Sequence, residues 1–588
     1  MDIDKLRKHV QNTIPKTVSP DLDKTTRQIV QCLQDAIEIS TPWARPTEFS
    51  RPGFTPECRE LQKNAKQAHR KILRYHTKYQ RPAPDRLWTD FLHKKHAARK
   101  TIQRFRQVAH RERVTAAAGN MGQVWRLSRW ASSRTTFQAY TPPLQGPDGL
   151  CFMPEEKACL LSQAFFPLPP VANLDDIRTY RYPEPLENPD ITQGEVLRSI
   201  RRPGADKAPG PDEVTNRVLQ ATADLIAPIL AGLYNESLRQ GYCPSHFRKA
   251  RTIALRKPGK DDYSKPKSYR PIALLNTIGK VFEGILALRL SYFAEEYKLL
   301  PDNHFGGRKG QGTETALHMV TEIISAAWKR GKTATALFLD ISGAFDNVSH
   351  TRLLHNLRKR RIPTLIVNWM ASFLSERFTT LELPEISCPE SRVDTGIPQG
   401  SPLSPVLYLF YNADMMESDE TTNIGYIDDT TMMAVGQSPA ENCRTLRSAF
   451  LKTCEPWSHT HASVFAPEKF ALVHFQPKGT EEDQEPLDLG RGRVVIPSES
   501  AKLLGVVLDR QLDFQAHLQQ IDAKCSRGLQ AMTSLGRSKW GLSLEDKRRV
   551  YNACVAPAAL YGVSVWQHPR VRRKKGAHDK QLRILNAI

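Results

Sequence analysis

Two adjacent aspartates stand out in this sequence, because like charges at neighbouring positions repel each other. Asp428 and Asp429 lie in the stretch GYIDDTTMMAVG (425–436), between the apolar runs NIGY and TTMMAV. Two apolar runs around a short polar break predict a β-hairpin with both carboxylates at its tip. Neighbouring side chains of a strand point to opposite faces, but a turn can bring them together. A divalent cation between the carboxylates would offset their repulsion.

A third carboxylate, Asp340, ends the apolar run ATALFLD (334–340), which has the length and character of a buried strand. Aspartate oxygens are hard ligands of the kind that magnesium prefers. Asp340, Asp428 and Asp429 would therefore bind two magnesium ions, with manganese as an alternative. One ion would activate an attacking hydroxyl, and the other would stabilise the leaving phosphate of an in-line displacement. An aromatic-x-Asp-Asp motif is weak by itself, and a solvated turn or a helix N-terminus is the alternative interpretation.

The elements that must position these aspartates lie between about residues 190 and 480. Short apolar runs ending in Gly, Pro or Asp alternate there with helical patterns, which is typical of a mixed α/β domain. The segment SHTRLLHNLRKRRIP (349–363) predicts a helix with Ser349 as its N-cap, because its leucines recur at helical spacing. Beyond residue 515 the pattern is helical again.

The charge of the chain favours a polyanionic partner. Lysine and arginine number 84 against 62 acidic residues, which gives a net charge of +22. Nucleic acid is the first candidate, and a generally basic surface is the alternative. Residues 93–113 predict a basic helix with Trp88, Trp125 and Trp130 nearby, a combination that suits phosphates and stacked bases, although a solvated helical face is the alternative. The cluster RVRRKKG (570–576) is either a weak nuclear address or another phosphate contact.

Composition narrows the class of protein further. Hydrophobic residues make up 40% of the 588, and the mean hydropathy is −0.47, as expected of a soluble globular chain with several domains. No apolar stretch is long enough to cross a bilayer, and the first residues lack the apolar core of a signal peptide, so no membrane partner is expected. The ten cysteines show no zinc-site or C-x-x-C spacing, which predicts reduced thiols in an intracellular protein.

Eight sequence blocks, in the right order and at the right spacing, resemble a reverse transcriptase of the non-LTR (LINE-like) retrotransposon class. The likeness covers roughly residues 200–566 strongly and the N-terminal region more loosely. The blocks are ADKAPGPDEVTNRVL (205–219), the fingers segment 247–286, FGGRKGQGTETALHMV (305–320), FLDISGAFDNV (338–348), GIPQGSPLSPVLYLFYNADM (396–415), YIDD (426–429), FAPEKFALVHF (465–475) and AKLLGVVLD (501–509).

The resemblance implies an α/β fold of the right-hand polymerase type, in which a palm with a small antiparallel sheet lies between fingers and a helical thumb. A basic helical N-terminal region would precede them. The implied divisions are a basic helical region at 1–140, a linker and the start of the fingers at 141–190, fingers at 191–333, a palm with the catalytic aspartates at 334–500, and a primer-grip strand with a helical thumb at 501–588.

The resemblance also implies roles for individual residues at the nucleotide site. Lys257 and Arg270 match fingers residues that hold the incoming triphosphate, and ordinary surface cations are the alternative. Phe345 matches the aromatic residue under the sugar, where a ring would clash with a 2′-hydroxyl and favour DNA synthesis. A core phenylalanine of the palm is the alternative for Phe345.

Further roles follow from the remaining blocks. Gln399 and Gly400 match residues near the nucleotide sugar and the template, with a simple turn residue as the alternative for Gln399. Lys469 matches a lysine that protonates the leaving pyrophosphate, and a surface lysine is its alternative. The backbone carbonyl of Ile341 would be an additional metal ligand, and Asp346 is interpreted as structural.

The implied activity is the copying of retrotransposon RNA by addition of dNTPs to the 3′ end of a DNA primer. Its partners would be the RNA template, the DNA primer or target and dNTPs, with nuclear localisation at the site of insertion. A catalytically inactive or truncated remnant that only binds RNA is one alternative, and an RNA-dependent RNA polymerase is another. Relatives carry an endonuclease upstream, whereas no endonuclease, zinc-knuckle or RNase H pattern is recognised here, which suggests the polymerase portion of a longer element. The sequence leaves the insertion target and the oligomeric state open.

Overall fold

The computed structural model describes residues 1–567 except 43–46, 48–49, 51, 118, 133–140, 148, 169–170, 478, 481–482, 534 and 538–539. These residues form two compact units. The first consists of the described residues in the ranges 1–42, 138–514 and 564–571, and the second of those in 43–137 and 515–563. The basic cluster 570–576 lies outside the described residues.

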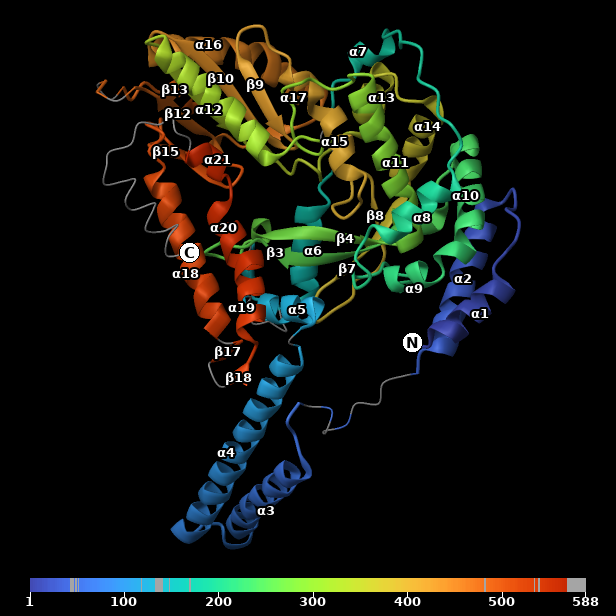
Figure 1. Cartoon of the computed structure of the whole chain (residues 1–588), viewed down its shortest axis with the longest axis vertical. Coiled ribbons are helices and arrows are strands. Elements are labelled where there is room, and N and C mark those ends of the chain that lie inside the picture. Colours follow the sequence, from blue (N-terminus) through green and yellow to red (C-terminus); the bar gives the residue numbers. More distant parts are fainter. Residues whose placement is uncertain are drawn as a thin grey trace. The chain divides into compact units, whose positions relative to one another are not determined.

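Four antiparallel strands form the central sheet of the first unit (Figure 1), in the order β12 (Ala471–Phe475), β5 (Thr333–Leu339), β10 (Asp429–Gly436) and β9 (Thr422–Tyr426). Six of the seven residues of β5 are buried, since it is a middle strand covered by helices. The apolar run that predicts a buried strand at 334–340 is thereby confirmed. Helices α12 (Thr313–Lys329) and α16 (Pro439–Ala449) pack against β5.

A second sheet of the first unit has the strand order β4–β3–β7–β8. β3 (Lys249–Arg256) pairs antiparallel with β4 (Tyr269–Leu275) and parallel with β7 (Arg377–Glu382), which in turn pairs with β8 (Ser391–Val393). The Thr252 and Thr379 hydroxyls, 2.8 Å apart, join β3 to β7 inside this sheet. The remaining strands of the unit form short pairs, namely β1 (Leu144–Gly146) with β2 (Gly149–Cys151), β6 (Ile341–Ser342) with β11 (Val464–Phe465), β13 (Leu487–Asp488) with β14 (Val494–Val495), and β15 (Ser500–Leu503) with β16 (Val506–Asp509).

Helices surround both sheets and supply most of the core of the first unit. Tyr234 stacks on Phe282 at a ring-centroid distance of 4.4 Å, and Phe282 contacts Trp369 at 4.7 Å. The helix predicted after Ser349 is confirmed, because the Ser349 hydroxyl caps α13 by accepting from the Arg352 backbone. The other helices of the unit are α1 (Ile3–Thr13), α2 (Leu22–Ser40), α6 (Pro154–Phe165), α7 (Asp175–Arg178), α8 (Gln193–Arg201), α9 (Asn216–Ala221), α10 (Ala223–Gln240), α11 (Thr277–Glu296), α13 (His350–Lys359), α14 (Thr364–Leu374), α15 (Ser404–Asn412), α17 (Glu455–Thr460) and α21 (Val563–Trp566).

The first two helices belong to the first unit through both apolar and ionic contacts. Leu6 and Leu33 are fully buried in its core. The Arg7 guanidinium contacts the Asp224 carboxylate of α10 at 2.7 Å, and the Tyr242 hydroxyl donates to Asp23 at 2.6 Å. Residues 1–42 therefore belong to the same unit as the two sheets, whereas the basic segment 93–113 lies in the second unit.

The second unit is mainly helical and is built from two segments far apart in the sequence. Its core contains Val114, Val124 and Leu127 from the first segment and Leu535 and Val550 from the second. The predicted basic helix at 93–113 is confirmed as part of α4 (Asp85–Ala116). The other elements are α3 (Pro56–Tyr79), α5 (Met121–Ser132), α18 (Gln515–Thr533), β17 (Gly536–Arg537), β18 (Trp540–Gly541), α19 (Leu544–Val550) and α20 (Ala556–Leu560).

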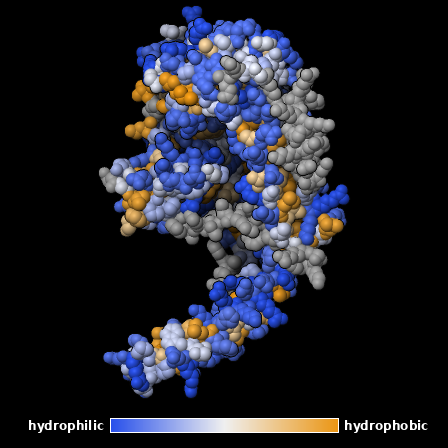
Figure 2. All heavy atoms as spheres, turned by 90° about the vertical axis from the view of Figure 1, so that its left-hand side faces the viewer, coloured by the Kyte–Doolittle hydropathy of each residue, from blue (hydrophilic) through white to orange (hydrophobic). Residues whose placement is uncertain are grey.

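The mixed α/β class predicted from the sequence is confirmed. None of the helices in the described ranges is both long and apolar enough to cross a membrane. All ten cysteines lie in the described ranges and are free thiols, as the spacing predicts. Hydrophilic residues cover most of the face shown in Figure 2, and hydrophobic residues appear there in small patches.

Candidate active site

The paired aspartates occupy the tip of a β-hairpin, as the sequence predicts. Asp429 pairs with Tyr426 across β9 and β10, which leaves only Ile427 and Asp428 in the turn. Ile427 has a φ of 58°, a left-handed conformation that is rare for a β-branched residue. Neighbours support it: the Asn412 side-chain amide donates to the Ile427 carbonyl at 2.7 Å, and a Cβ on Gly306 would lie 2.6 Å from the Ile427 nitrogen. This backbone conformation is therefore held by close packing around the turn.

Asp340 lies beside this turn because of the strand register. Thr430 of β10 pairs with Leu339 of β5, so the next position in the antiparallel register places Asp429 opposite Asp340. Residues opposite each other in such a pair have Cβ atoms about 4.5–5.5 Å apart. The fold thus brings together three carboxylates that are remote along the chain.

Burial and mutual repulsion raise the pKa values of the hairpin carboxyls. Burial is the largest cause at Asp429, followed by the charges of Asp428 and Asp340, and together they raise its pKa to about 6. Burial likewise raises the pKa of Asp428, with a further increase from the Asp340 charge. A group of buried like charges is what a bound cation would stabilise.

Lys469 contacts Asp340 from the opposite side of β5. The Ala466 backbone donates to the Asp340 carbonyl at 3.0 Å, and this places the following short turn beside the aspartate. The Lys469 Nζ lies 2.8 Å from the Asp340 Oδ1. Because both side chains are about half exposed, at 53% and 43%, this ion pair contributes little to stability.

The chemistry of the carboxylates suits a divalent cation, although they are not arranged as a finished ligand sphere. Within the described ranges, no set of three or more His, Cys, Asp or Glu side chains is positioned to ligate one metal ion. Asp340 is instead paired with Lys469. Ile341 lies next to Asp340 in β6, where it pairs with Phe465. The hard oxygen donors and their repulsion nevertheless fit magnesium by ligand type and charge.

Two cations, Lys257 and Arg270, lie on the β3–β4 hairpin, and the charge of Arg270 reaches one of the aspartates. Lys257 follows β3, and its Nζ donates to the Lys267 carbonyl at 2.8 Å. Arg270 lies in β4 and is exposed. Burial lowers the pKa of Lys257, and the charges of Arg270 and Lys469 lower it further, so these three cations lie near one another. The Arg270 charge also acts on Asp428, where it partly opposes the increase in pKa caused by burial.

Phe345 stacks on Tyr408 in this region. The two ring centroids are 5.2 Å apart and the planes are nearly parallel, at 11°. Tyr408 is fully buried, and its pKa is raised well above its usual value, first by burial and then by the Asp428 charge. The Phe345 ring is thus supported by an aromatic side chain that lies close to the turn aspartate.

Gln399 and Gly400 are fixed against β4. The Ala273 backbone donates to the Gln399 carbonyl at 2.8 Å. Gly400 has a φ of 146°, and a Cβ there would lie 2.1 Å from the Ala273 carbonyl oxygen. The loop can therefore approach β4 this closely only with glycine at this position.

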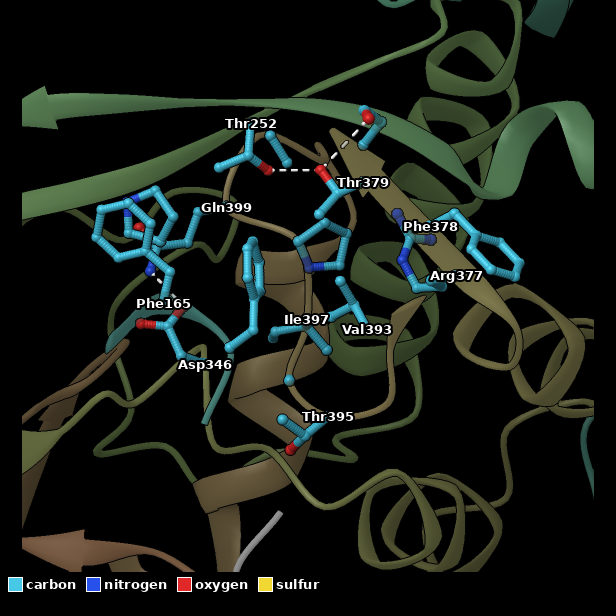
Figure 3. Close-up of a pocket in the computed structure, with 16 residues that line it drawn as sticks. Phe165, Thr252, Asp346, Arg377, Phe378, Thr379, Val393, Thr395, Ile397 and Gln399 are labelled. Atoms are coloured by element: carbon cyan, nitrogen blue, oxygen red, sulfur yellow. Dashed lines mark hydrogen bonds between the residues drawn. The ribbon is translucent and has the colours of Figure 1, made fainter. Parts of the chain in front are cut away.

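Asp346, interpreted from the sequence as structural, lines a small cavity together with Gln399 (Figure 3). The Gln399 side-chain amide donates to the Asp346 carboxylate at 2.8 Å. Burial raises the pKa of Asp346 to about 6, against the opposing effects of this hydrogen bond and the Lys257 charge. A carboxylate directly after Phe345 is the signal by which the sequence could have revealed this contact.

The chain is similar to several known proteins, and part of it matches a known protein family. Residues 255–508 match the family described as reverse transcriptase (RNA-dependent DNA polymerase). The chain is 31% identical over 380 residues to a probable RNA-directed DNA polymerase from transposon BS of Drosophila melanogaster, a match that covers 63% of this chain and 42% of that protein. It is 29% identical over 458 residues to the RNA-directed DNA polymerase from mobile element jockey of the same species, which covers 76% and 47%.

The chain therefore spans less than half the length of these two relatives. Among solved structures, telomerase from Candida tropicalis in complex with a fragment of telomeric RNA aligns with a TM-score of 0.32 and 11% identity. That alignment covers 63% of this chain and 67% of the telomerase chain.

Proposed function

We propose, from the premise that the chain carries a reverse transcriptase domain of the non-LTR retrotransposon type, that it is an RNA-directed DNA polymerase. The matches confirm the resemblance predicted from the eight sequence blocks. The reaction would be template-directed addition of dNTPs to the 3′ end of a DNA primer. The observation that carries this proposal is the cross-strand placement of Asp340 beside Asp428 and Asp429, with the charge of Arg270 acting on Asp428 and Lys257 lying near Arg270.

In this proposal the first unit provides the palm and fingers of a right-hand polymerase. The sheet β12–β5–β10–β9 with its two packed helices corresponds to the palm, since the aspartates lie at the ends of its two middle strands. The sheet β4–β3–β7–β8 corresponds to the fingers, since it supplies Lys257 and Arg270. The helices α18–α20 would form the thumb.

Asp340, Asp428 and Asp429, with the Ile341 carbonyl, would bind two magnesium ions, and manganese is the alternative. When bound, the ions would supply charge stabilisation for the attacking and leaving oxygens of an in-line displacement. The aspartates themselves contribute position: β5 and β10 fix two of them in register, and the tight turn fixes the third.

Lys257 and Arg270 would bind the triphosphate of the incoming nucleotide. A lysine supplies a compact positive charge, and an arginine supplies a planar pair of donors that matches phosphate oxygens. Both lie on the β3–β4 hairpin, so they would approach the triphosphate from the same side. Their charges would stabilise the negative charge that develops on the leaving pyrophosphate.

Phe345 would select deoxynucleotides by sterics. The ring is supported by Tyr408 and cannot retreat without disturbing a buried residue. A 2′-hydroxyl placed against this ring would meet carbon atoms and lose its hydrogen bonds to water. Gln399 and Gly400, fixed on β4, would define the adjoining wall near the sugar and the template.

Lys469 would donate a proton to the leaving pyrophosphate. In this structure its ammonium is paired with Asp340, so the pair must separate before the lysine reaches the nucleotide. The exposure of both side chains makes this separation inexpensive in free energy. The RNA template, the DNA primer and dNTPs would be the partners, and nuclear localisation at the insertion site follows from the proposed role.

Primer extension tests the proposal at Asp428. The full chain should extend a DNA primer annealed to RNA when dNTPs and magnesium are supplied. Asp428→Asn keeps the size of the side chain and removes its charge, so we expect extension to fall by at least about 10³-fold. Asp419→Asn, at an exposed position of the same domain, is the matched control and should retain full activity.

Two results would contradict the assignment. Equal extension by the parent and Asp428→Asn would remove Asp428 from the reaction. RNA binding by the parent without any extension would instead favour the alternative of an RNA-binding remnant.

A further inference from the structure

The helical pair α3 and α4 in the second unit carries an exceptional concentration of positive charge. The two helices lie side by side (Figure 1). Between residues 56 and 116 the sequence contains 17 lysines and arginines but only 5 acidic residues. The resulting excess of 12 positive charges is more than half of the +22 of the whole chain.

Few side chains of the two helices are buried. α3 and α4 have 24 and 32 residues, and their buried side chains are Cys58, Ala65, Ala68, Ile72, Ala98 and Val114. Most of these side chains are small, which lets the helix backbones approach each other closely. In the space-filling view the helical pair, at the lower end, is mostly hydrophilic with isolated hydrophobic residues (Figure 2). Repulsion among so many positive charges destabilises the helix pair. A polyanionic ligand bound to it would offset this repulsion.

Several of these positively charged side chains line a groove between the two helices. It has a volume of about 670 Å³ and is lined by residues of both helices. Four exposed cations border it, namely Lys66, Lys95, Arg99 and Arg106. The Lys95 ammonium lies 5.4 Å from the centre of the Phe91 ring, and His69 packs on the same ring at 4.8 Å. The groove thus combines cations at its rim with an aromatic side chain in its lining.

Exposed aromatic side chains lie near the loop that joins the helices. Tyr79 and Trp88 are 48% and 41% exposed. The Arg81 guanidinium lies over the rings of Tyr75 and Tyr79, at 5.7 Å from each centroid. Rings and guanidinium planes at the surface are what unpaired bases stack on, and duplex DNA or a folded acidic protein does not need them.

We propose that the α3–α4 hairpin binds single-stranded nucleic acid, with phosphates along the groove and bases on the exposed rings. The proposal deepens the function proposed above, because the template RNA is the single strand that this function supplies. A single strand of DNA presents the same phosphates and bases, so the experiment compares the two. The hairpin is an additional binding site, separate from the residues assigned to nucleotide addition.

The test is binding of labelled oligonucleotides to the full-length chain carrying Lys66→Gln, Lys95→Gln, Arg99→Gln and Arg106→Gln together. Fluorescence anisotropy would be measured with an unstructured RNA, a DNA of the same sequence and the corresponding duplex, over a range of salt concentrations. We expect RNA affinity to fall about tenfold or more. The slope of log affinity against log salt should become shallower by about 0.7 for each phosphate that the variant no longer neutralises.

A matched control separates this site from a general charge effect. Lys8→Gln, Lys16→Gln, Lys24→Gln and Arg27→Gln remove the same charge from exposed positions of α1, α2 and their connection. The control variant should bind RNA within about twofold of the parent at physiological salt, because its substitutions lie in the first unit and none of them lines the groove. Equal losses for the two variants, or unchanged binding of the groove variant, would overturn the proposal, as would a preference for the duplex over both single strands.

The outcome does not depend on catalysis. All binding measurements are repeated in the Asp428→Asn background, so an inactive chain can still show the hairpin site, and an active chain can still lack it. Trp88→Ala provides a second variant that leaves the charge unchanged. It should weaken single-strand binding by about 5- to 100-fold through the loss of stacking, without changing the salt slope. Circular dichroism of each variant checks that the helices are retained.

Discussion

At the scale of single residues, the surroundings of a side chain decide whether it can do chemistry. Phe345 is ordinary in sequence, but Tyr408 holds its ring in a stack, and the charge of Asp428 acts on Tyr408. Asp346 is likewise an ordinary carboxylate until burial and the Gln399 amide surround it. The surroundings of both side chains are thus set by neighbours that are distant along the chain.

Truncation of Phe345 tests its steric role. Phe345→Ala removes the ring and should open space for a 2′-hydroxyl, whereas the buried Tyr408 is unchanged. We expect the ratio of kcat/KM for dNTPs to that for rNTPs to fall by about 10- to 200-fold, the range over which a pocket discriminates by size alone. Single-nucleotide incorporation with matched dNTP and rNTP measures this ratio. Efficient rNTP use by the parent chain, unchanged in the variant, would favour an RNA-dependent RNA polymerase.

Asp346 should make the stability of the protein depend on pH. Its pKa of about 6 in the folded state lies above the unfolded value of 3.8, so the folded state binds the proton more tightly. The stability contributed by this proton is fully present below about pH 4 and is lost as pH rises through 6, by up to about 3 kcal/mol. Lys257, whose charge faces Asp346, reduces this effect.

Asp346→Asn removes that titration and keeps an acceptor for the Gln399 amide. The variant should therefore unfold at a higher urea concentration than the parent at pH 7.5, whereas the two should differ little at pH 4. Urea unfolding at both pH values measures the difference. A variant that is less stable than the parent at pH 7.5 would show that the carboxylate charge stabilises the site.

At the level of secondary structure, the site forms where the ends of two strands, a hairpin and a loop come together. β5 ends where the β9–β10 turn begins, so a single register places Asp340 opposite Asp429. The loop at Gln399 rests on β4, the strand that carries Arg270. Buried Glu283 of α11 accepts a hydrogen bond from Ser401, which ties the same loop to a core helix. The candidate site is thus built from two sheets and one loop.

Gly400→Ala tests the contact between this loop and β4. The added Cβ would meet the Ala273 carbonyl at 2.1 Å, so the loop must move. We expect the KM for dNTPs to rise about tenfold or more, with a loss of stability of about 1–3 kcal/mol. Gly331→Ala is the matched control, because Gly331 also has a positive φ, of 68°, but a Cβ there meets nothing within 4 Å. An equal effect of both substitutions on KM would show that the loop contact is not needed.

At the scale of the whole molecule, charge and chain connectivity organise two units. The second unit joins α5 to α18–α20 through a core that includes Val124 and Leu535. Such contacts between distant segments form only after the intervening chain has folded or collapsed, since closing a long loop costs entropy. The same unit carries the basic α3–α4 hairpin, so the positive charge of the chain is concentrated in one part of it.

Local patterns in the sequence predict the individual elements and the residue types that they carry. The two apolar runs around Asp428 and Asp429 predict a hairpin, the apolar run before Asp340 predicts a buried strand, and residues 93–113 predict a basic helix. The structure contains all three. Periodicity and turn residues act over a few positions, which is why they can be identified without a structure.

Which of these elements meet depends instead on contacts between residues far apart in the chain. The register that sets Asp340 opposite Asp429, the pairing of Lys469 with Asp340 and the hydrogen bond from Gln399 to Asp346 join residues far apart in the chain. The groove between α3 and α4 follows from how two helices pack. These contacts depend on the burial of whole faces of sheets and helices, a property of the folded chain that no short stretch of sequence contains.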